Sequence, residues 1–403
     1  MKSRTSKIDQ KLSIQRKKYF LKSLFKKANR LIVDFKPLQE ITSDYCAENI
    51  LLKDLKTTIT YTPKELHKDG KIIETSVFPV RVYALKNVFA TPNASYFLTN
   101  NLKEIFFEKL HDDERDIYVY NSFNLLFHGQ KLAKINNLPK VTYETDAIFF
   151  GGIFTNNYYH FLVEIISKAE YLSQIPRSQE LPIVLDISVQ QNNNLRAIAE
   201  FFLKGYKLVY LRNDQYHGFK TLWFITSPNT TIPNITEGSK YEAQFTKISE
   251  KSISFIRNKC LENYDADKVR IEKVDKVFIA RKSEFRKYNE SELLAIADKY
   301  GFIAVYFEEL NIHEQIFLLQ NADYVVGPSG AAFTNLIFAK ENSKGLIWLG
   351  SVWEDFSAFS TIAKLVNFDL YHYRYQSKSK DFHEDYQLDI NIFEQQITQL
   401  LSK

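Results

Sequence analysis

The sequence predicts an α/β protein in which two Rossmann-like domains face a cleft, preceded by a basic N-terminal helical arm. Three observations predict this fold. The chain has 403 residues, more than one simple core usually holds, which favours two domains. Short apolar runs alternate with amphipathic stretches about twice as long, a pattern typical of βαβ units and a covered parallel sheet. Residues 1–36 contain twelve Lys and Arg but only two acids, a net charge of +10.

The composition is that of a folded globular protein. Hydrophobic residues make up 45% of the chain and charged residues 25%, and the 12 Gly and 10 Pro are too few for a low-complexity chain. Cys46 and Cys260 form neither a metal motif nor a disulfide framework, which favours a reducing compartment. We find neither a signal-peptide pattern nor an apolar run of the roughly 18 residues that span a bilayer. We therefore expect a cytoplasmic protein.

Residues 1–40 form the basic arm. Within it, Phe20, Leu24, Ala28 and Leu31 fall on one helical stripe surrounded by lysines. Such a helix can lie on an anionic membrane, which would make the protein peripheral at the inner face of the cell membrane. It can equally pack on its own protein, and both readings stay open. We do not expect nucleic-acid binding, because the basic pattern does not continue beyond the arm.

Residues 41–235 are predicted to form the first, acceptor-side domain. Its early part is rich in strands, because β-branched and aromatic residues dominate 76–85, 116–123 and 141–150. An alternating pattern follows, with strands predicted at 146–152, 181–187, 207–212 and 219–226 and helices at 156–172 and 194–203. The turn-forming residues of 227–240 then indicate a linker.

Residues 236–380 show the alternation more clearly and are predicted to form a second, nucleotide-binding domain. Strands are predicted at 276–281, 302–307, 323–327, 345–350 and 370–375, and helices at 289–301, 311–322, 331–342 and 355–367. The remaining segment, 381–403, is predicted to contain a C-terminal helix that packs back on the first domain.

The second domain carries basic residues where a ligand is expected. In open α/β sheets, ligands bind beyond the carboxyl ends of the strands. Arg281 ends the apolar strand at 276–281, and Arg286 follows five residues later. Two guanidinium groups in such a loop can bind a phosphate or diphosphate, each through two hydrogen bonds.

A second loop of this domain has the features of an anion site. In the stretch GPSGAAFTN, Gly327 and Gly330 permit a tight turn, and the N–H groups of Gly330, Ala331 and Ala332 begin a helix. The first N–H groups of a helix and its dipole favour a bound anion. The loop is not a P-loop, because it lacks the lysine and the spacing of that motif.

The stretch NNYYHFLVEIISKAEYL, residues 156–172, places His160 and Glu164 one helical turn apart. The two residues are either an acid–base pair in an active site or a hydrogen-bonded pair that stabilises local structure. They lack the further ligands that zinc requires. Asp265 and Asp267 lie in a polar stretch rather than after an apolar strand, so we predict no metal site.

Three blocks of the chain, 156–172, 277–302 and 311–338, resemble the signature blocks of the family 61 glycosyltransferases. Bacterial members of that family are often labelled capsular polysaccharide biosynthesis proteins. The similarity covers roughly residues 76–375. It implies a GT-B fold and an inverting transfer of a hexosyl or pentosyl group from a nucleotide sugar, with UDP-sugars as donors and with no metal or other cofactor.

The residue patterns described above and the resemblance together give the roles expected of single residues. His160 and Glu164 are expected to be catalytic. The residues expected to bind the donor diphosphate are Arg281, Arg286, Ser329, Gly330, Ala331 and Asn335. Those expected to bind the acceptor or to support the site are Asn157, Tyr159 and Asn289.

Two positions depart from the family pattern. Members commonly have a histidine where this chain has Ser329, and an acid at the end of the next strand, where this chain has Trp348. A serine can bond a phosphate oxygen but carries no charge. The identity of the transferred sugar therefore stays open.

The expected chemistry suits these residues. Without a metal, arginines and a helix N-terminus must stabilise the departing diphosphate. A base must also take the proton of the acceptor hydroxyl. His160 is preferred over Glu164 for this role, because histidine ordinarily titrates near neutral pH. The expected partners are a nucleotide sugar and a glycan or lipid-linked glycan acceptor. A non-catalytic polysaccharide-assembly protein and a pyruvyl transferase remain alternatives.

Overall fold

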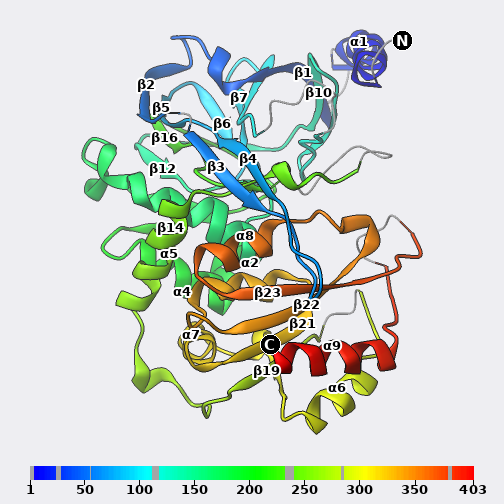
Figure 1. The fold of residues 1–403 in the computed structure, drawn as a ribbon. Coiled ribbons are helices and arrows are strands. Elements are labelled where there is room, and N and C mark those ends of the chain that lie inside the picture. Colours follow the sequence, from blue (N-terminus) through cyan, green and yellow to red (C-terminus); the bar gives the residue numbers. More distant parts are fainter. Residues whose placement is uncertain are drawn as a thin grey trace. The chain divides into compact units, whose positions relative to one another are not determined.

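The computed structural model describes residues 4–23, 29–54, 56–110, 118–231, 240–282, 286–379 and 384–403. The chain divides into two compact units (Figure 1). Unit 1 comprises Met1–Lys56 and Phe78–Ser239, and unit 2 comprises Thr57–Val77 and Lys240–Lys403. The sequence analysis placed one domain boundary at 235/236 and missed the excursion of Thr57–Val77 into unit 2.

The larger sheet of unit 1 has the strand order β11-β15-β6-β7-β8-β1-β10-β9. It is antiparallel except where β1 pairs with β8 and β11 pairs with β15. Its strands are β1 (Arg30–Pro37), β6 (Val88–Ala90), β7 (Tyr96–Thr99), β8 (Glu104–Phe107), β9 (Leu125–His128), β10 (Leu132–Asn136), β11 (Lys140–Tyr143) and β15 (Tyr216–Phe219).

The second sheet of unit 1 has the order β14-β13-β12-β16-β5-β2. Four neighbouring strands are parallel, and β5 and β2 extend the sheet in antiparallel fashion. The strands are β2 (Cys46–Lys53), β5 (Val80–Leu85), β12 (Ala147–Phe149), β13 (Ile183–Asp186), β14 (Leu208–Leu211) and β16 (Leu222–Ile225). The parallel part is the alternation that the sequence predicted, and Phe97, Phe149 and Phe224 pack edge to face in the core beside it.

The connections of unit 1 are mostly short helices. They are η1 (Leu38–Glu40), α2 (Tyr158–His160), η2 (Phe161–Ile165), η3 (Ile166–Gln174), η4 (Ser178–Glu180), α3 (Ile187–Gln191) and α4 (Asn193–Phe202), with the short strand β17 (Thr230–Thr231) near the end of the unit. The side chains of Asp186 and Asn192 cap α3 and α4 by accepting from backbone N–H groups, which fixes where these helices begin.

Helix α1 (Arg4–Ser23) begins the described chain and packs on unit 1. Leu12 is fully buried, and Arg16 forms an ion pair of 2.7 Å with Asp34 of β1. The predicted stripe is wrong at Leu31, which lies in β1. The side chain of Phe20, and Leu24 and Ala28, lie outside the described residues. Within the described part of the chain, we find no helix with the length and apolarity of a membrane span.

Unit 2 contains a five-stranded sheet that is parallel throughout, in the order β20-β19-β21-β22-β23. Its strands are β19 (Lys276–Ala280), β20 (Ile303–Tyr306), β21 (Tyr324–Pro328), β22 (Lys344–Gly350) and β23 (Asp369–Tyr375), with β18 (Thr246–Lys247) outside it. The helices are α5 (Glu250–Glu262), α6 (Glu290–Lys299), α7 (Ile312–Asn321), α8 (Ala358–Leu365) and α9 (Ile390–Ser402). Shorter 3₁₀ turns are η5 (Ala243–Phe245), η6 (Ala266–Lys268), η7 (Phe307–Glu309), η8 (Ala331–Phe338) and η9 (Ser351–Trp353).

The excursion Thr57–Val77 supplies a hairpin to unit 2. Its strands β3 (Lys56–Tyr61) and β4 (Ile72–Val77) pair with each other. The Thr60 hydroxyl donates to the carbonyl of Thr246 at 2.7 Å. The backbone of Lys64 forms an isolated parallel β-bridge with that of Tyr371 on β23. The segment therefore lies against the outer strand of the unit 2 sheet, where unpaired backbone groups would otherwise be exposed.

The C-terminal helix α9 packs within unit 2, on α6 and β22, whereas we had expected it to pack back on the first domain. Its buried residues Phe393, Ile397 and Leu400 join the core formed by Phe278 and Trp348. The apolar stripe of α9 thus covers one face of the sheet that directly precedes it in the chain.

We predict that Asp9 anchors α1. Its carboxylate accepts from the backbone N–H groups of Gln130, Lys131 and Leu132, in the turn between β9 and β10. Asp9→Ala should lower the free energy of unfolding by about 1 kcal/mol, since these hydrogen bonds are largely exposed. Urea unfolding measures this, and Asp9→Asn, which keeps one acceptor oxygen, should recover part of the loss. Equal stability of all three proteins would contradict the prediction.

Candidate active site

The helical segment that carries His160 and Glu164 is irregular. Asn157 caps it, because its side chain accepts from the N–H groups of Tyr159 at 2.9 Å and of His160 at 3.4 Å. After one α-helical turn, Phe161–Ile165 adopt a π-helical conformation, and 3₁₀ turns follow. The sequence predicted one continuous helix over 156–172. A π-turn is rare, and such turns are often found at functional sites.

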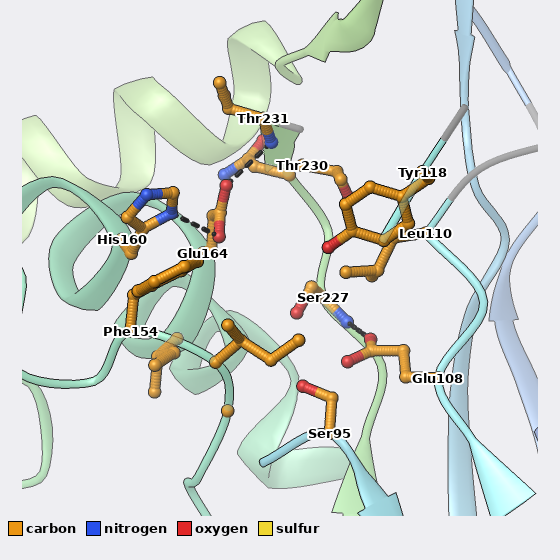
Figure 2. A pocket seen from close by; sticks show the side chains of 14 residues that line it. Ser95, Glu108, Leu110, Tyr118, Phe154, His160, Glu164, Ser227, Thr230 and Thr231 are labelled. Atoms are coloured by element: carbon orange, nitrogen blue, oxygen red, sulfur yellow. Dashed lines mark hydrogen bonds and ion pairs between the residues drawn. The ribbon is translucent and has the colours of Figure 1, made fainter. Parts of the chain in front are cut away.

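His160 and Glu164 are bonded to each other (Figure 2). His160 Nδ1 lies 2.9 Å from Glu164 Oε2, and Glu164 Oε1 accepts from the N–H of Thr231 at 2.7 Å. Both oxygens of the carboxylate are therefore held in place. Because a carboxylate only accepts hydrogen bonds, Nδ1 carries the proton of a neutral imidazole and Nε2 keeps its lone pair.

The segment that leaves β16 supports this pair. Asn229 Nδ2 donates to the carbonyl of Val163 at 2.7 Å, within the π-turn. The hydroxyls of Tyr159 and Thr231 are 2.5 Å apart. Residues 227–240 were predicted only to form a linker, and Tyr159 only to bind the acceptor or to support the site. In the structure Tyr159 contacts Thr231, which in turn orients Glu164.

A small cavity lies beside the His160–Glu164 pair and has a volume of about 20 Å³. Figure 2 shows the side chains of Glu108 and Tyr118 on one side of it and those of Phe154 and Glu164 on the other. Ser95, Ser227 and Thr230 supply further polar atoms to its wall. A space of this volume with polar walls has room for about one water molecule or one hydroxyl group.

Two buried charged residues lie close to this cavity and were missed by the sequence analysis. Glu108 lines it and accepts from the N–H of Ser227 at 2.5 Å. Lys168 is fully buried, donates to the carbonyl of Gly151 at 3.3 Å and lies 4.6 Å from the centre of the Phe224 ring. Burial raises the pKa of Glu108 and lowers that of Lys168, although the opposite charges counteract both shifts.

The candidate anion site lies in unit 2, where the strand order reverses. In the order β20-β19-β21-β22-β23, the chain connections turn to opposite sides between β19 and β21, the point at which such sheets bind ligands. Arg281 follows β19, and Ser329 and Gly330 follow β21. Arg281 Nη2 donates to the carbonyl of Ser329 at 2.6 Å. The structure thus brings together two loops that the sequence identified separately.

Steric crowding explains why residue 330 of this loop is a glycine. A Cβ atom at Gly330 would lie 2.7 Å from Arg281 Nη2, so a larger residue would displace the guanidinium group. The backbone N–H of Arg281 donates to Glu290 at 2.9 Å, which holds the loop from its other side. After Gly330, residues Ala331–Phe338 form a 3₁₀ helix rather than the predicted α-helix over 331–342.

The two arginines of the site concentrate positive charge. Burial and the nearby Arg281 charge lower the pKa of Arg286 to about 10. Among the described residues, Arg281 Nη1 is buried and has no hydrogen-bond partner. A buried guanidinium N–H without an acceptor is costly, and a bound anion would remove that cost. Arg286 also adopts a left-handed backbone conformation, with φ of 60°.

Other residues predicted for the site have clear local contacts. Ser329 and Asn335 are buried, and Asn335 Nδ2 donates to the carbonyl of Ala332 at 3.1 Å, within its own helical turn. Asn289 bonds the backbone of Leu388 through both its amide nitrogen and its amide oxygen. Trp348 is buried and donates to the hydroxyl of Tyr386 at 3.0 Å. These contacts stabilise the surroundings of the two arginines.

No cluster of three or more His, Cys, Asp or Glu side chains that could hold a metal ion is found among the described residues. The acids at 265 and 267 belong to a 3₁₀ turn, in which the Asp265 carboxylate accepts from the N–H of Asp267 at 3.1 Å. That carboxylate therefore caps its own turn.

We predict that Glu108 makes the stability of the protein depend on pH. Its pKa is raised above the ordinary value of 4.5, so the folded protein holds this proton to higher pH than the unfolded chain does. The stability from this group is complete below pH 4.5 and is lost as the pH rises through the raised pKa, by up to about 1.4 kcal/mol per pH unit. In Glu108→Gln this loss should be absent. Urea unfolding of both proteins across that pH range tests this, and parallel curves would refute it.

The family comparison covers both groups of residues. Residues 158–346 match the family model described as Glycosyltransferase 61. The matched region contains the His160–Glu164 pair of unit 1 and the two arginines and the Ser329–Gly330 turn of unit 2. Among curated proteins, none matches this chain. The match over residues 158–346 supports glycosyltransferase family 61 for this protein.

Proposed function

We propose that this protein is an inverting, metal-independent glycosyltransferase that transfers a hexosyl or pentosyl group from a UDP-sugar to a glycan or lipid-linked glycan. Its setting would be the cytoplasmic synthesis of a cell-surface or capsular polysaccharide in a bacterium. The observation that carries the proposal is the pair of arginines at the switch point of the unit 2 sheet, where a buried N–H of Arg281 finds no acceptor among the residues that the structure describes. The match to a glycosyltransferase family suggests which anion this is. In this proposal it is the diphosphate of a nucleotide sugar.

The proposed donor site stabilises the leaving group. As the bond between C1 of the sugar and the diphosphate oxygen breaks, negative charge develops on that oxygen. The guanidinium groups of Arg281 and Arg286 and the first N–H groups of η8, at Gly330 and Ala331, would stabilise this charge. Ser329 and Asn335 would hold the turn that positions them. In this proposal these groups take the place of a divalent cation.

The proposed acceptor site supplies the base. Nε2 of His160 would take the proton of the acceptor hydroxyl while that oxygen forms the new bond to C1, and Glu164 would orient the ring through Nδ1. A single displacement on the face opposite the diphosphate inverts the configuration at C1. Asn157 and Tyr159 would support the pair through the contacts described above. In this proposal the two units act on one pair of substrates, as in a GT-B enzyme.

Arg281 should dominate donor affinity. Because its guanidinium would make charged hydrogen bonds to the diphosphate, Arg281→Ala should weaken UDP binding about 10- to 100-fold, measured by calorimetry in the presence of EDTA. The matched control is Lys282→Ala, since the exposed Lys282 ammonium already pairs with Glu309. Unchanged UDP affinity in Arg281→Ala, or binding that requires a divalent cation, would contradict the proposed site.

His160 should control the chemical step rather than donor binding. His160→Ala and Glu164→Gln should lower kcat for sugar transfer by about 10²- to 10⁴-fold and leave the Kd for UDP nearly unchanged. The control is His217→Ala, which removes another buried histidine of unit 1, bonded to the carbonyl of Arg212. Near-wild-type kcat in both site variants would show that the pair is structural.

The basic arm would bring the enzyme to its acceptor at the membrane. Residues 1–36 carry a net charge of +10, and Ile14 of α1 is 73% exposed. The protein should therefore co-sediment with vesicles that contain phosphatidylserine and be released by salt, because the attraction is electrostatic. Equal binding to neutral vesicles, or no binding at low salt, would rule out this peripheral contact.

A further inference from the structure

The arrangement of Arg286 is unfavourable in three ways. Its backbone adopts a left-handed conformation, its guanidinium is largely desolvated although the residue is partly exposed, and the like charge of Arg281 lies close to it. Conformations of this kind persist only where the surrounding structure holds them. The contacts that hold this one identify residues on which the anion site depends.

The contacts come from residues 385–388, which we call the C-terminal clasp. Lys287, the residue after Arg286, is bonded to the clasp at both of its backbone groups. Its N–H donates to Asp385 Oδ1 at 2.7 Å, and its carbonyl accepts from the N–H of Tyr386 at 3.0 Å. Two further bonds of about the same length join Asn289 to Leu388. One backbone hydrogen bond and three bonds that involve side chains thus join residues 287–289 to the clasp.

The clasp is itself anchored by an aromatic stack. The ring of Tyr386 lies between the rings of Tyr375 and Tyr288, with centroids 4.2 and 5.6 Å away and nearly parallel planes. Its hydroxyl accepts from Trp348 Nε1 at 3.0 Å. Tyr386 is 4% exposed, so the clasp is fixed to the core of unit 2. Trp348, at the position where the family pattern has an acid, thereby holds the clasp.

We propose that the C-terminal clasp is part of the anion site, and that Asp385 is a positioning residue that holds Arg286 in its binding conformation. The clasp lies beyond the matched residues 158–346. The proposal rests on the proposed function for the identity of the anion, a diphosphate, but not for the restraint of the loop.

Asp385 permits a sharp test, because its side chain is exposed and its replacement spares the core. The variants are Asp385→Ala, which removes the acceptor for the Lys287 N–H, and Asp385→Asn, which keeps it. The matched control is Asp389→Ala. Asp389 is an exposed carboxylate that follows the clasp, accepts from the N–H groups of Asn391 and Ile392 at 2.9 and 3.0 Å and caps α9. Two quantities are measured on the full chain, the affinity for inorganic pyrophosphate and amide hydrogen exchange of residues 286–290.

Asp385→Ala should bind pyrophosphate about fivefold more weakly than the wild type, the effect of one net hydrogen bond. Its amides at 286–290 should exchange faster, and Asp385→Asn should restore much of both properties. Asp389→Ala should resemble the wild type in both, although it loses a helix cap. Wild-type exchange in Asp385→Ala, or equal effects of Asp385→Ala and Asp389→Ala, would overturn the proposal. If the wild type binds no pyrophosphate, the anion site fails, and the exchange data alone decide whether the clasp restrains the loop.

Discussion

The hydrogen bond from Arg281 to the carbonyl of Ser329 is the contact on which the proposed anion site of unit 2 depends. It joins the ends of two adjacent parallel strands, β19 and β21, at the point where the strand order reverses. A parallel sheet places all of its carboxyl ends along one edge, so a single guanidinium group can connect two loops far apart in sequence. With Nη2 used in this way, Nη1 stays buried without an acceptor among the described residues. The Arg281 side chain therefore holds the two loops together through Nη2 and keeps the N–H groups of Nη1 for the proposed anion.

Unit 2 was predictable because its central strands β19, β21 and β22 are buried almost throughout. Strands such as β19 and β22 read as uninterrupted apolar runs, which cannot be exposed in any fold. Unit 1 was harder to predict, since strands as short as β6 and β7 leave almost no periodic signal. The hairpin of 57–77 escaped prediction for another reason. Thr60 and Lys64 of this hairpin are hydrogen-bonded to Thr246 and Asp369, which lie far away in the sequence. No local sequence pattern predicts such contacts.

The residues of the candidate site also differ in how far they could be predicted from the sequence. His160 and Glu164 were identifiable because polar residues spaced one turn apart interrupt an apolar stretch. Lys168 offered the same signal, again four residues further on, and could have been found. Glu108 could not have been found in this way. It follows directly after strand β8, and only the folding of the unit 1 sheets brings it to the cavity. The π-turn was also beyond prediction, since it depends on Asn229 bonding the carbonyl of Val163 from a distant segment.

The excursion of Thr57–Val77 has a consequence for how the chain is made. During synthesis this hairpin leaves the ribosome long before the residues it pairs with, such as Thr246, Thr361 and Tyr371. Unit 2 therefore cannot complete its outer edge by folding as a contiguous segment, and the early hairpin must wait with unpaired backbone groups. Contacts of such long sequence separation slow folding and expose the chain to aggregation.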